Sequence, residues 1–181
     1  SRPSIYQSFS AINSTLLDAV SDTEDLNARY AQITPEARAE LPGLSLFLNL
    51  AFGERRASLR KPDASLHKAI PSGGARHPTE VFLVVFDLPF LSAGVYHYNV
   101  EHNRLDCLHN ENARDRCVKA TYDLAKKDTE PPRAMLVFTS LKERAMWRYR
   151  EPRSWRATLV DGGHAAGIAG RLAPMFGYRV R

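Results

Sequence analysis

The sequence predicts an α+β domain with a real core, on three observations. Residues 81–86 are a run of aliphatic, β-branched and aromatic residues of strand length, directly after a loop with paired glycines. Residues 94–109 predict a hairpin, with strands at 94–98 and 104–109. Residues 44–52 are apolar nearly all round, which is typical of a central buried helix. The chain has 181 residues, 44% of them hydrophobic, so we expect one domain.

The first part of the chain predicts an N-terminal helical extension over residues 1–40. Apolar residues at helical spacing favour a helix at 13–20, and residues 21–25 can cap and restart it. Thr34, Pro35 and Glu36 form a strong helix-start signal. The main domain is then expected over residues 41–181. Because the chain begins at Ser1, we expect a trimmed chain or one piece of a longer protein.

The later segments alternate between helix and strand patterns. Residues 112–126 predict an amphipathic helix, residues 134–140 a buried strand, and residues 158–173 a helix rich in small residues. A face of small residues lets a helix approach another helix or a flat ring closely. We expect His97 to be a half-exposed structural residue of its strand. His164 is expected to be a buried helix residue with a hydrogen-bond partner.

The bulk composition limits the partners. A net charge of +5 permits nucleic acid, an acidic peptide or a phosphorylated cofactor. Arginines between 144 and 156 are interleaved with Trp147, Tyr149 and Trp155, a mixture that can stack on bases or grip a flavin, a peptide or a partner subunit. Nucleic acid is the less favoured of these. No apolar run approaches the roughly 20 residues of a membrane helix. The two cysteines lack metal-site spacing and predict reduced thiols in the cytoplasm.

The glycine loop, residues 71–80, is the segment around which we expect the site to form. Gly73 and Gly74 lack a Cβ, so a flat or anionic group can approach their backbone, and they can adopt positive φ without strain. Ser72 adds a hydroxyl, and Arg76 and His77 add further donors. Such a loop suits a cofactor held by amides and short side chains. A plain turn before a strand is the alternative.

Residues 71–78 resemble the corresponding loop of the FMN-dependent nitroreductase fold. Their Pro-Ser-Gly-Gly-Ala form is most similar to the SagB-type dehydrogenases, which include the azoline oxidases of thiazole- and oxazole-forming peptide pathways. Residues 94–99 resemble the family's Gly-Leu-Tyr-His-Tyr segment. The resemblance covers residues 41–178 and implies a nitroreductase-like fold. That fold has a central mixed or antiparallel sheet flanked by helices, here incomplete at the C-terminal end.

The resemblance also implies FMN as the cofactor and residues that would bind it. The loop would contribute Ser72, Gly73, Gly74, Ala75 and Arg76. A second group has the Arg-x-Ser-x-Arg form that the family uses for the FMN phosphate, and it consists of Arg56, Ser58 and Arg60. Guanidinium groups and a hydroxyl suit a dianion. This group lies much closer to the glycine loop than the family's motif does, so a solvated basic loop is the alternative.

The candidate catalytic residues are Arg148 and Tyr149, because azoline oxidases have a Lys-Tyr pair in a similar segment. Tyr149 can exchange a proton if neighbouring arginines lower its pKa. Arg148 cannot replace lysine as a base, since its guanidinium stays protonated, but it can orient a carbonyl or stabilise negative charge. The alternative is that both residues are structural.

Two functions follow from the resemblance. The first is an FMN-dependent oxidoreductase, a homodimer or paired subunit in which hydride moves between flavin N5 and a peptide or small-molecule substrate. The second is a non-catalytic scaffold or partner subunit of a peptide-modifying complex, favoured by Arg148 and the short C-terminal end. A general nitro- or quinone reductase is less favoured, because the loop lacks that branch's Asn and Gln.

Overall fold

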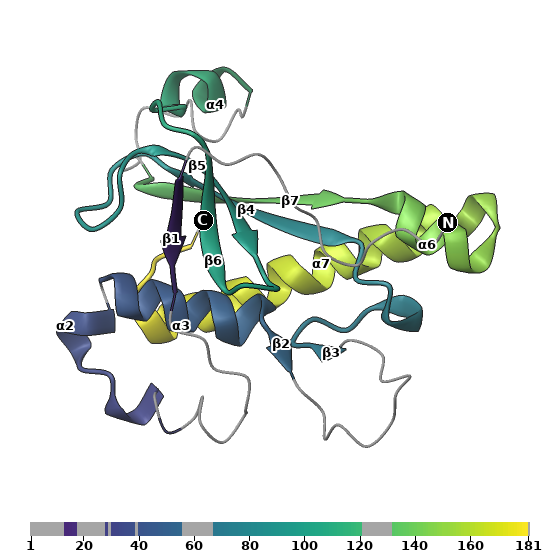
Figure 1. Ribbon diagram of the computed structural model, residues 1–181, viewed down its shortest axis with the longest axis horizontal. Helices are drawn as coiled ribbons and strands as arrows, with labels where there is room; N and C mark the ends of the chain where they lie inside the picture. Colours follow the sequence, from purple (N-terminus) through teal and green to yellow (C-terminus); the bar gives the residue numbers. More distant parts are fainter. Residues whose placement is uncertain are drawn as a thin grey trace.

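A five-stranded antiparallel sheet forms the centre of the domain (Figure 1). The computed structural model describes residues 13–17, 28, 30–38, 40–55, 67–120 and 132–180. The strand order is β1-β6-β5-β4-β7, and every pairing is antiparallel. The strands are β1 (Asn13–Leu16), β4 (Thr79–Val85), β5 (Gly94–Asn99), β6 (Arg104–His109) and β7 (Ala134–Ser140). A separate two-stranded ribbon joins β2 (Glu54–Arg55) to β3 (His67–Lys68).

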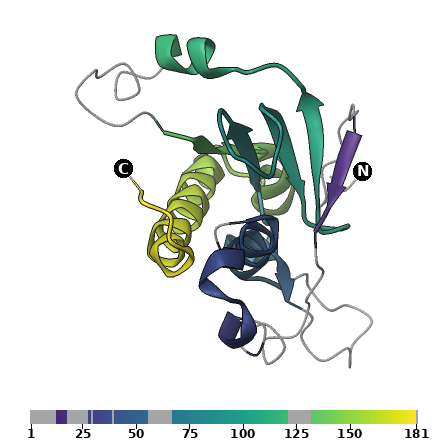
Figure 2. The ribbon, with the colours of Figure 1, turned by 90° about the vertical axis from the view of Figure 1, so that its left-hand side faces the viewer.

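Helices lie on both faces of the sheet, but they cover much more of one face than of the other. The two longest, α3 and α7, lie side by side across one face, while α4 lies at one end of the other (Figures 1 and 2). The helices are α2 (Pro35–Arg38), α3 (Leu41–Phe52), α4 (Arg114–Ala120), α6 (Lys142–Tyr149) and α7 (Trp155–Leu172), and the 3-10 turns are η1 (Gly73–Ala75), η2 (Pro152–Ser154) and η3 (Ala173–Phe176). None of the described helices has the length and apolar character needed to cross a bilayer.

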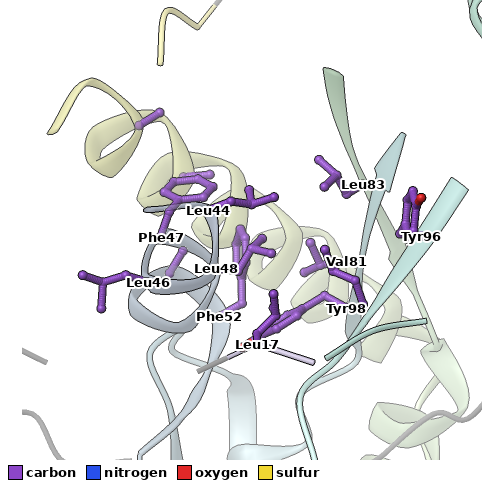
Figure 3. Packing of buried hydrophobic residues seen from close by; sticks show 14 of the residues in the cluster. Leu17, Leu44, Leu46, Phe47, Leu48, Phe52, Val81, Leu83, Tyr96 and Tyr98 are labelled. Atoms are coloured by element: carbon purple, nitrogen blue, oxygen red, sulfur yellow. The ribbon is translucent and has the colours of Figure 1, made fainter. Parts of the chain in front are cut away.

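The main core lies between α3 and the sheet. Figure 3 shows Phe47, Leu48 and Phe52 of α3 between α7 and the strands that carry Val81 and Tyr98. Helix α3 buries side chains all round because one side meets the sheet and another meets α7. The predicted central helix is therefore confirmed. It begins three residues early, at Leu41, because a proline is tolerated in the first turn.

The predicted hairpin is confirmed, and so is the strand over 134–140, but this strand is not buried as predicted, because β7 lies at the edge of the sheet. The predicted N-terminal helix is wrong for residues 13–16. These residues form β1 and pair with β6 at the edge of the sheet. Ser14 Oγ also donates a hydrogen bond of 2.6 Å to Asp106 Oδ1. Edge pairing satisfies the backbone of the segment, so tertiary context overrides its helical spacing. The rest of that predicted helix, and residues 121–126 of another, lie outside the described residues.

A buried polar contact ties the hairpin together. The Tyr98 hydroxyl donates a 2.7 Å hydrogen bond to Asn103 Oδ1, and Asn103 holds the turn with φ of 42°. Burial raises the pKa of Tyr98, so the hydroxyl stays protonated as a donor.

Tyr98→Phe is expected to lower the free energy of unfolding by about 1–1.5 kcal/mol, the net value of a buried hydrogen bond. Tyr30→Phe is the matched control, because its hydroxyl makes only an exposed 3.3 Å bond to Met175 O. Urea denaturation measures both variants. Equal losses would show that the Tyr98 bond contributes nothing beyond the change of residue type.

Candidate functional site

The glycine loop follows the β2–β3 ribbon and leads into β4. Its first part forms η1, in which Gly74 has φ of 61°. Ala75 and His77 also have positive φ, 51° and 45°. Residues other than glycine rarely adopt this region, and such strain collects at functional sites. The prediction that the paired glycines allow positive φ is therefore confirmed at Gly74.

The loop is fastened to α7 by one buried carboxylate. Ser72 Oγ donates a 2.7 Å hydrogen bond to Asp161 Oδ2, and the Gly73 amide donates to Oδ1 at 3.4 Å. The His77 amide in turn donates to Ser72 Oγ at 2.9 Å. Asp161 lies on the buried face of α7 with Thr158 and Ala165. Two donors that the sequence assigns to a cofactor thus face a carboxylate, which disfavours a phosphate at this point.

The two glycines differ in what covers them. A Cβ built on Gly74 would overlap the Tyr149 hydroxyl, so Tyr149 closes that side of the loop. A Cβ built on Gly73 would meet only the Ala157 side chain, at 3.8 Å. Both glycines are exposed, so the two sides of the loop differ only in the Tyr149 hydroxyl that lies over Gly74. The paired glycines therefore create one closed and one open side.

The other predicted site residues are placed unevenly around the loop. Tyr149 reaches the loop from the end of α6 although 43% of it stays exposed, and Arg148 is exposed one residue before it. Arg76 Nε donates a 2.9 Å hydrogen bond back to the Gly74 carbonyl. Ala75 completes η1 and donates its amide to Ser72 O at 3.0 Å. Arg56, Ser58 and Arg60 lie outside the described residues.

A buried ion-pair network positions α6 and hence Tyr149. Arg144 Nη1 of α6 forms an ion pair with Glu80 of β4, 2.6 Å from Oε1, and the other carboxylate oxygen of Glu80 lies 2.9 Å from His97 Nε2 of β5. Arg144 Nη1 also donates to the His77 carbonyl at 2.6 Å. Burial by itself raises the pKa of Glu80, but the His97 hydrogen bond and the charges of Arg144 and Lys68 bring that pKa below its usual value.

This network corrects the prediction for His97. The side chain is buried, with 1% of the residue exposed, because its ring lies against Phe82 and Glu80 of β4. The prediction for His164 is also wrong, since this residue is exposed on the outer face of α7. The buried face of that helix is set by Thr158, Asp161 and Ala165, and His164 does not fall on it.

A hollow lies behind the loop, between it, β4 and α7. It encloses about 180 Å³ when open solvent is included, but its interior has room for no more than about one water molecule and its accessible surface is almost wholly apolar. Sites for drug-sized ligands are roughly 300–1,000 Å³. Its polar lining consists of Lys68, Ser72, His77, Thr79 and Asp161, and its apolar lining of Ile70, Pro71 and Pro78. Burial lowers the pKa of Lys68 to about 8, although nearby Glu80 opposes this.

Sequence reasoning missed three of these lining residues. Thr79 lies within the loop and Lys68 lies three residues before it, so their positions in the sequence could have indicated them. Asp161 lies in a helix of mostly small residues, where a lone acid also stands out. Among the described residues, no group of three His, Cys, Asp or Glu side chains is arranged to hold a metal ion.

Comparison with known proteins places the chain in a family. No family model matches the chain. The trifolitoxin-processing protein TfxB of Rhizobium leguminosarum bv. trifolii is 40% identical over 124 residues, which are 67% of this chain and 33% of that protein. A chain of the E. coli microcin synthetase McbBCD complex, with truncated pro-MccB17 bound, matches with a TM-score of 0.57 and 26% identity over 76% of this chain and 50% of its own length. The chain belongs to the SagB-type branch of the nitroreductase fold.

Further structures support the fold assignment. An Anabaena variabilis protein assigned as a nitroreductase matches with a TM-score of 0.76 and 23% identity, over 97% of this chain and 34% of that one. One from Ralstonia eutropha matches with a TM-score of 0.55 and 16% identity, over 91% and 72%. The predicted α+β, nitroreductase-like fold is thus confirmed. The chain spans about a third of the length of the curated relative that it matches.

Proposed function

We propose that the protein is an FMN-dependent oxidoreductase of the SagB type that acts on a peptide-derived substrate. The open side of Gly73, on a strained loop beside Tyr149, is the observation that carries the proposal. The peptide is supported by two similar proteins, one that processes trifolitoxin and one that belongs to a microcin synthetase complex. When bound, FMN would supply hydride transfer.

At the glycine loop, a flat flavin ring can be accommodated only outside the hollow. The hollow is too small for a flavin, and Asp161 repels a phosphate from Ser72 and Gly73. The exposed backbone at Gly73 has no side chain of its own, so a ring edge can lie against it. Tyr149 and the loop residues Ala75 and Arg76 would border the ring. Arg56, Ser58 and Arg60 remain our proposal for the phosphate.

A second protein surface would have to cover this open site. Large apolar side chains are exposed on α6 and at the start of α7, namely Met146 (41% exposed), Trp147 (40%), Trp155 (48%) and Leu159 (60%). On α7, a Cβ built on Gly163, Gly167 or Gly170 would meet nothing within 4 Å, so another helix can approach closely. An exposed apolar group of this kind marks an interaction surface. We propose that a second copy or a paired subunit packs here, next to the loop.

Arg148 and Tyr149 then have distinct roles. The Tyr149 hydroxyl lies over Gly74, where it can donate a hydrogen bond to a group bound on the loop. Arg148, exposed on the same helix, provides a fixed positive charge for a substrate carbonyl or carboxylate.

Both cysteines are free, which fits our expectation of a reducing cytoplasmic environment.

A non-catalytic scaffold in a peptide-modifying complex is the second candidate. It is favoured by the same contacts that limit FMN: Asp161 engages Ser72 and Gly73, and Tyr149 covers Gly74. A scaffold would use the exposed apolar surface to bind its partner, and it would not need an open loop for a cofactor.

Titration of the purified protein with FMN, followed by quenching of flavin fluorescence, separates the two candidates. We expect saturable binding that Gly73→Val weakens at least about tenfold, because the side chain occupies the space of the ring. Gly73 lacks positive φ and a Cβ there has room, so this variant should keep the fold. Ser92→Val, at an exposed position, is the control. A wild-type protein that ignores FMN supports the scaffold, and unchanged binding by Gly73→Val shows that the ring lies elsewhere.

A further inference from the structure

A group of exposed cations lies where α6 is joined to α7 through η2. Four arginine side chains are exposed there and form what we call the arginine corner, namely Arg148, Arg150, Arg153 and Arg156. Among the described residues, none of these four guanidinium groups makes a hydrogen bond or an ion pair. Only two carboxylates are exposed in residues 142–156, those of Glu143 and Glu151. The unpaired positive charge therefore attracts anions, and a guanidinium fork fits a carboxylate especially well.

The backbone of the arginine corner is held in one conformation by its own hydrogen bonds. Arg150 ends α6 with a positive φ of 53°, and its N–H donates a 2.8 Å hydrogen bond to the Met146 carbonyl. In η2, Ser154 Oγ donates a 2.8 Å hydrogen bond to the Glu151 carbonyl. Because the backbone is already ordered, a ligand that binds here has to order only the arginine side chains.

Both ends of the arginine corner meet the glycine loop. At the end of α6, the Tyr149 hydroxyl lies over Gly74. At the start of α7, the Ala157 side chain would lie 3.8 Å from a Cβ built on Gly73. In the sequence, an exposed arginine directly precedes each of these two contact residues. The arginine corner is thus continuous with the loop at which we propose that the reaction takes place.

Two of the four arginines are best placed to reach a molecule bound at the loop. Arg148 is next to Tyr149, and Arg156 is next to Ala157. Successive residues of an α-helix are about 100° apart around its axis, so Arg156 lies between Ala157 on the side of the loop and Trp155 on the exposed apolar surface. A substrate that extends from the loop along the protein surface would therefore pass these guanidinium groups.

We propose that the arginine corner binds carboxylate side chains of the peptide-derived substrate, with Arg148 and Arg156 as the main contacts. The protein then prefers a peptide with Asp or Glu close to the residue that is held at the loop. Arginines and exposed aromatic rings also suit nucleic acid. Continuity with the loop and the two similar proteins that are linked to peptides favour the acidic peptide. The inference rests on the proposed function, because it specifies the class of peptide.

Fluorescence anisotropy tests this binding without FMN. The probes are rhodamine-labelled peptides of repeated Asp-Gly-Leu units and the matched peptide of Asn-Gly-Leu units. In about 50 mM salt, we expect the Asp peptide to bind at least about tenfold more tightly than the Asn peptide, because several exposed ion pairs add together. The preference should shrink in about 0.5 M salt, which screens these pairs. Equal affinity for the two peptides in low salt overturns the proposal.

Arg148→Gln combined with Arg156→Gln should reduce the preference of the protein for the Asp peptide to about threefold or less. The matched control is Arg116→Gln combined with Lys119→Gln, which removes the same charge from exposed positions on α4. The control should keep nearly the whole preference. Equal losses in the two double variants would mean that net charge alone attracts the peptide, which overturns the proposal.

Charge reversal at the same two positions gives a positive readout. Arg148→Glu combined with Arg156→Glu should bind a peptide of Lys-Gly-Leu units more tightly than the wild type does. A labelled oligothymidylate that depends on the two arginines, in a wild type without a preference for the Asp peptide, would assign the surface to nucleic acid and overturn the proposal. If the arginine-dependent preference is found in a protein that ignores FMN, the acidic peptide site stands and the proposed redox function fails.

Discussion

Replacing Arg144 by methionine is expected to lower the free energy of unfolding by about 3–5 kcal/mol, the usual cost of breaking a buried ion pair. The substitution leaves the Glu80 carboxylate buried against His97 with one partner lost, and it removes a donor from the His77 carbonyl. Because Arg144 joins α6 to Glu80 of β4 and to the His77 carbonyl of the loop, its loss should also weaken the position of Tyr149 over Gly74.

Urea denaturation measures this loss, with Arg116→Met as the control. Arg116 is exposed on α4, so its removal should change stability by no more than about 0.5 kcal/mol. The pKa of Glu80 is lowered in the folded protein, so its contribution is complete above the unfolded value near 4.5 and is lost as pH falls through the folded value. The difference in the free energy of unfolding between wild type and Arg144→Met should therefore become smaller as the pH falls. A gap below about 1 kcal/mol at neutral pH would contradict the network.

Gly74→Val should destabilise the protein and displace Tyr149, whereas Gly73→Val next to it should do neither. Gly74 has φ of 61°, where a β-branched residue is strained, and its Cβ would overlap the Tyr149 hydroxyl. The backbone strain alone is worth about 1–3 kcal/mol. Gly73 has neither constraint.

Urea denaturation of the two valine variants, each alone and combined with Tyr149→Ala, separates backbone strain at residue 74 from overlap with the Tyr149 hydroxyl. Tyr149→Ala should recover part of the loss in Gly74→Val, because it removes the overlap and leaves the strain. It should recover nothing in Gly73→Val. Equal destabilisation by the two valines would mean that the loop does not have one open and one closed side.

Local patterns predicted most of the fold and little of the site. The helix over 44–52, the hairpin and the strand over 134–140 depend on short-range apolar patterns that match their surroundings. Residues 13–16 have a helical pattern that loses to pairing with β6, a contact about 90 positions away. The burial of His97 and His164 was predicted wrongly for the same reason, because it depends on which element packs over each face of their strand or helix.

The site shows the same limit. Ser72 and the glycines were found because a loop motif is local, but their partner Asp161 is 89 residues away along the chain. Tyr149 was predicted from its resemblance to a catalytic pair, not from its position over Gly74. Lys68 is adjacent to the motif, yet only the packing of the ribbon reveals that it lines the hollow.

A crystal structure of the protein grown with excess FMN tests the central claim most directly. The account predicts electron density for the ring against the open side of Gly73, bordered by Tyr149 and covered by a second protein surface. Density for the ring at another place, or a Gly73 side closed by the chain's own residues while FMN is in excess, would contradict it.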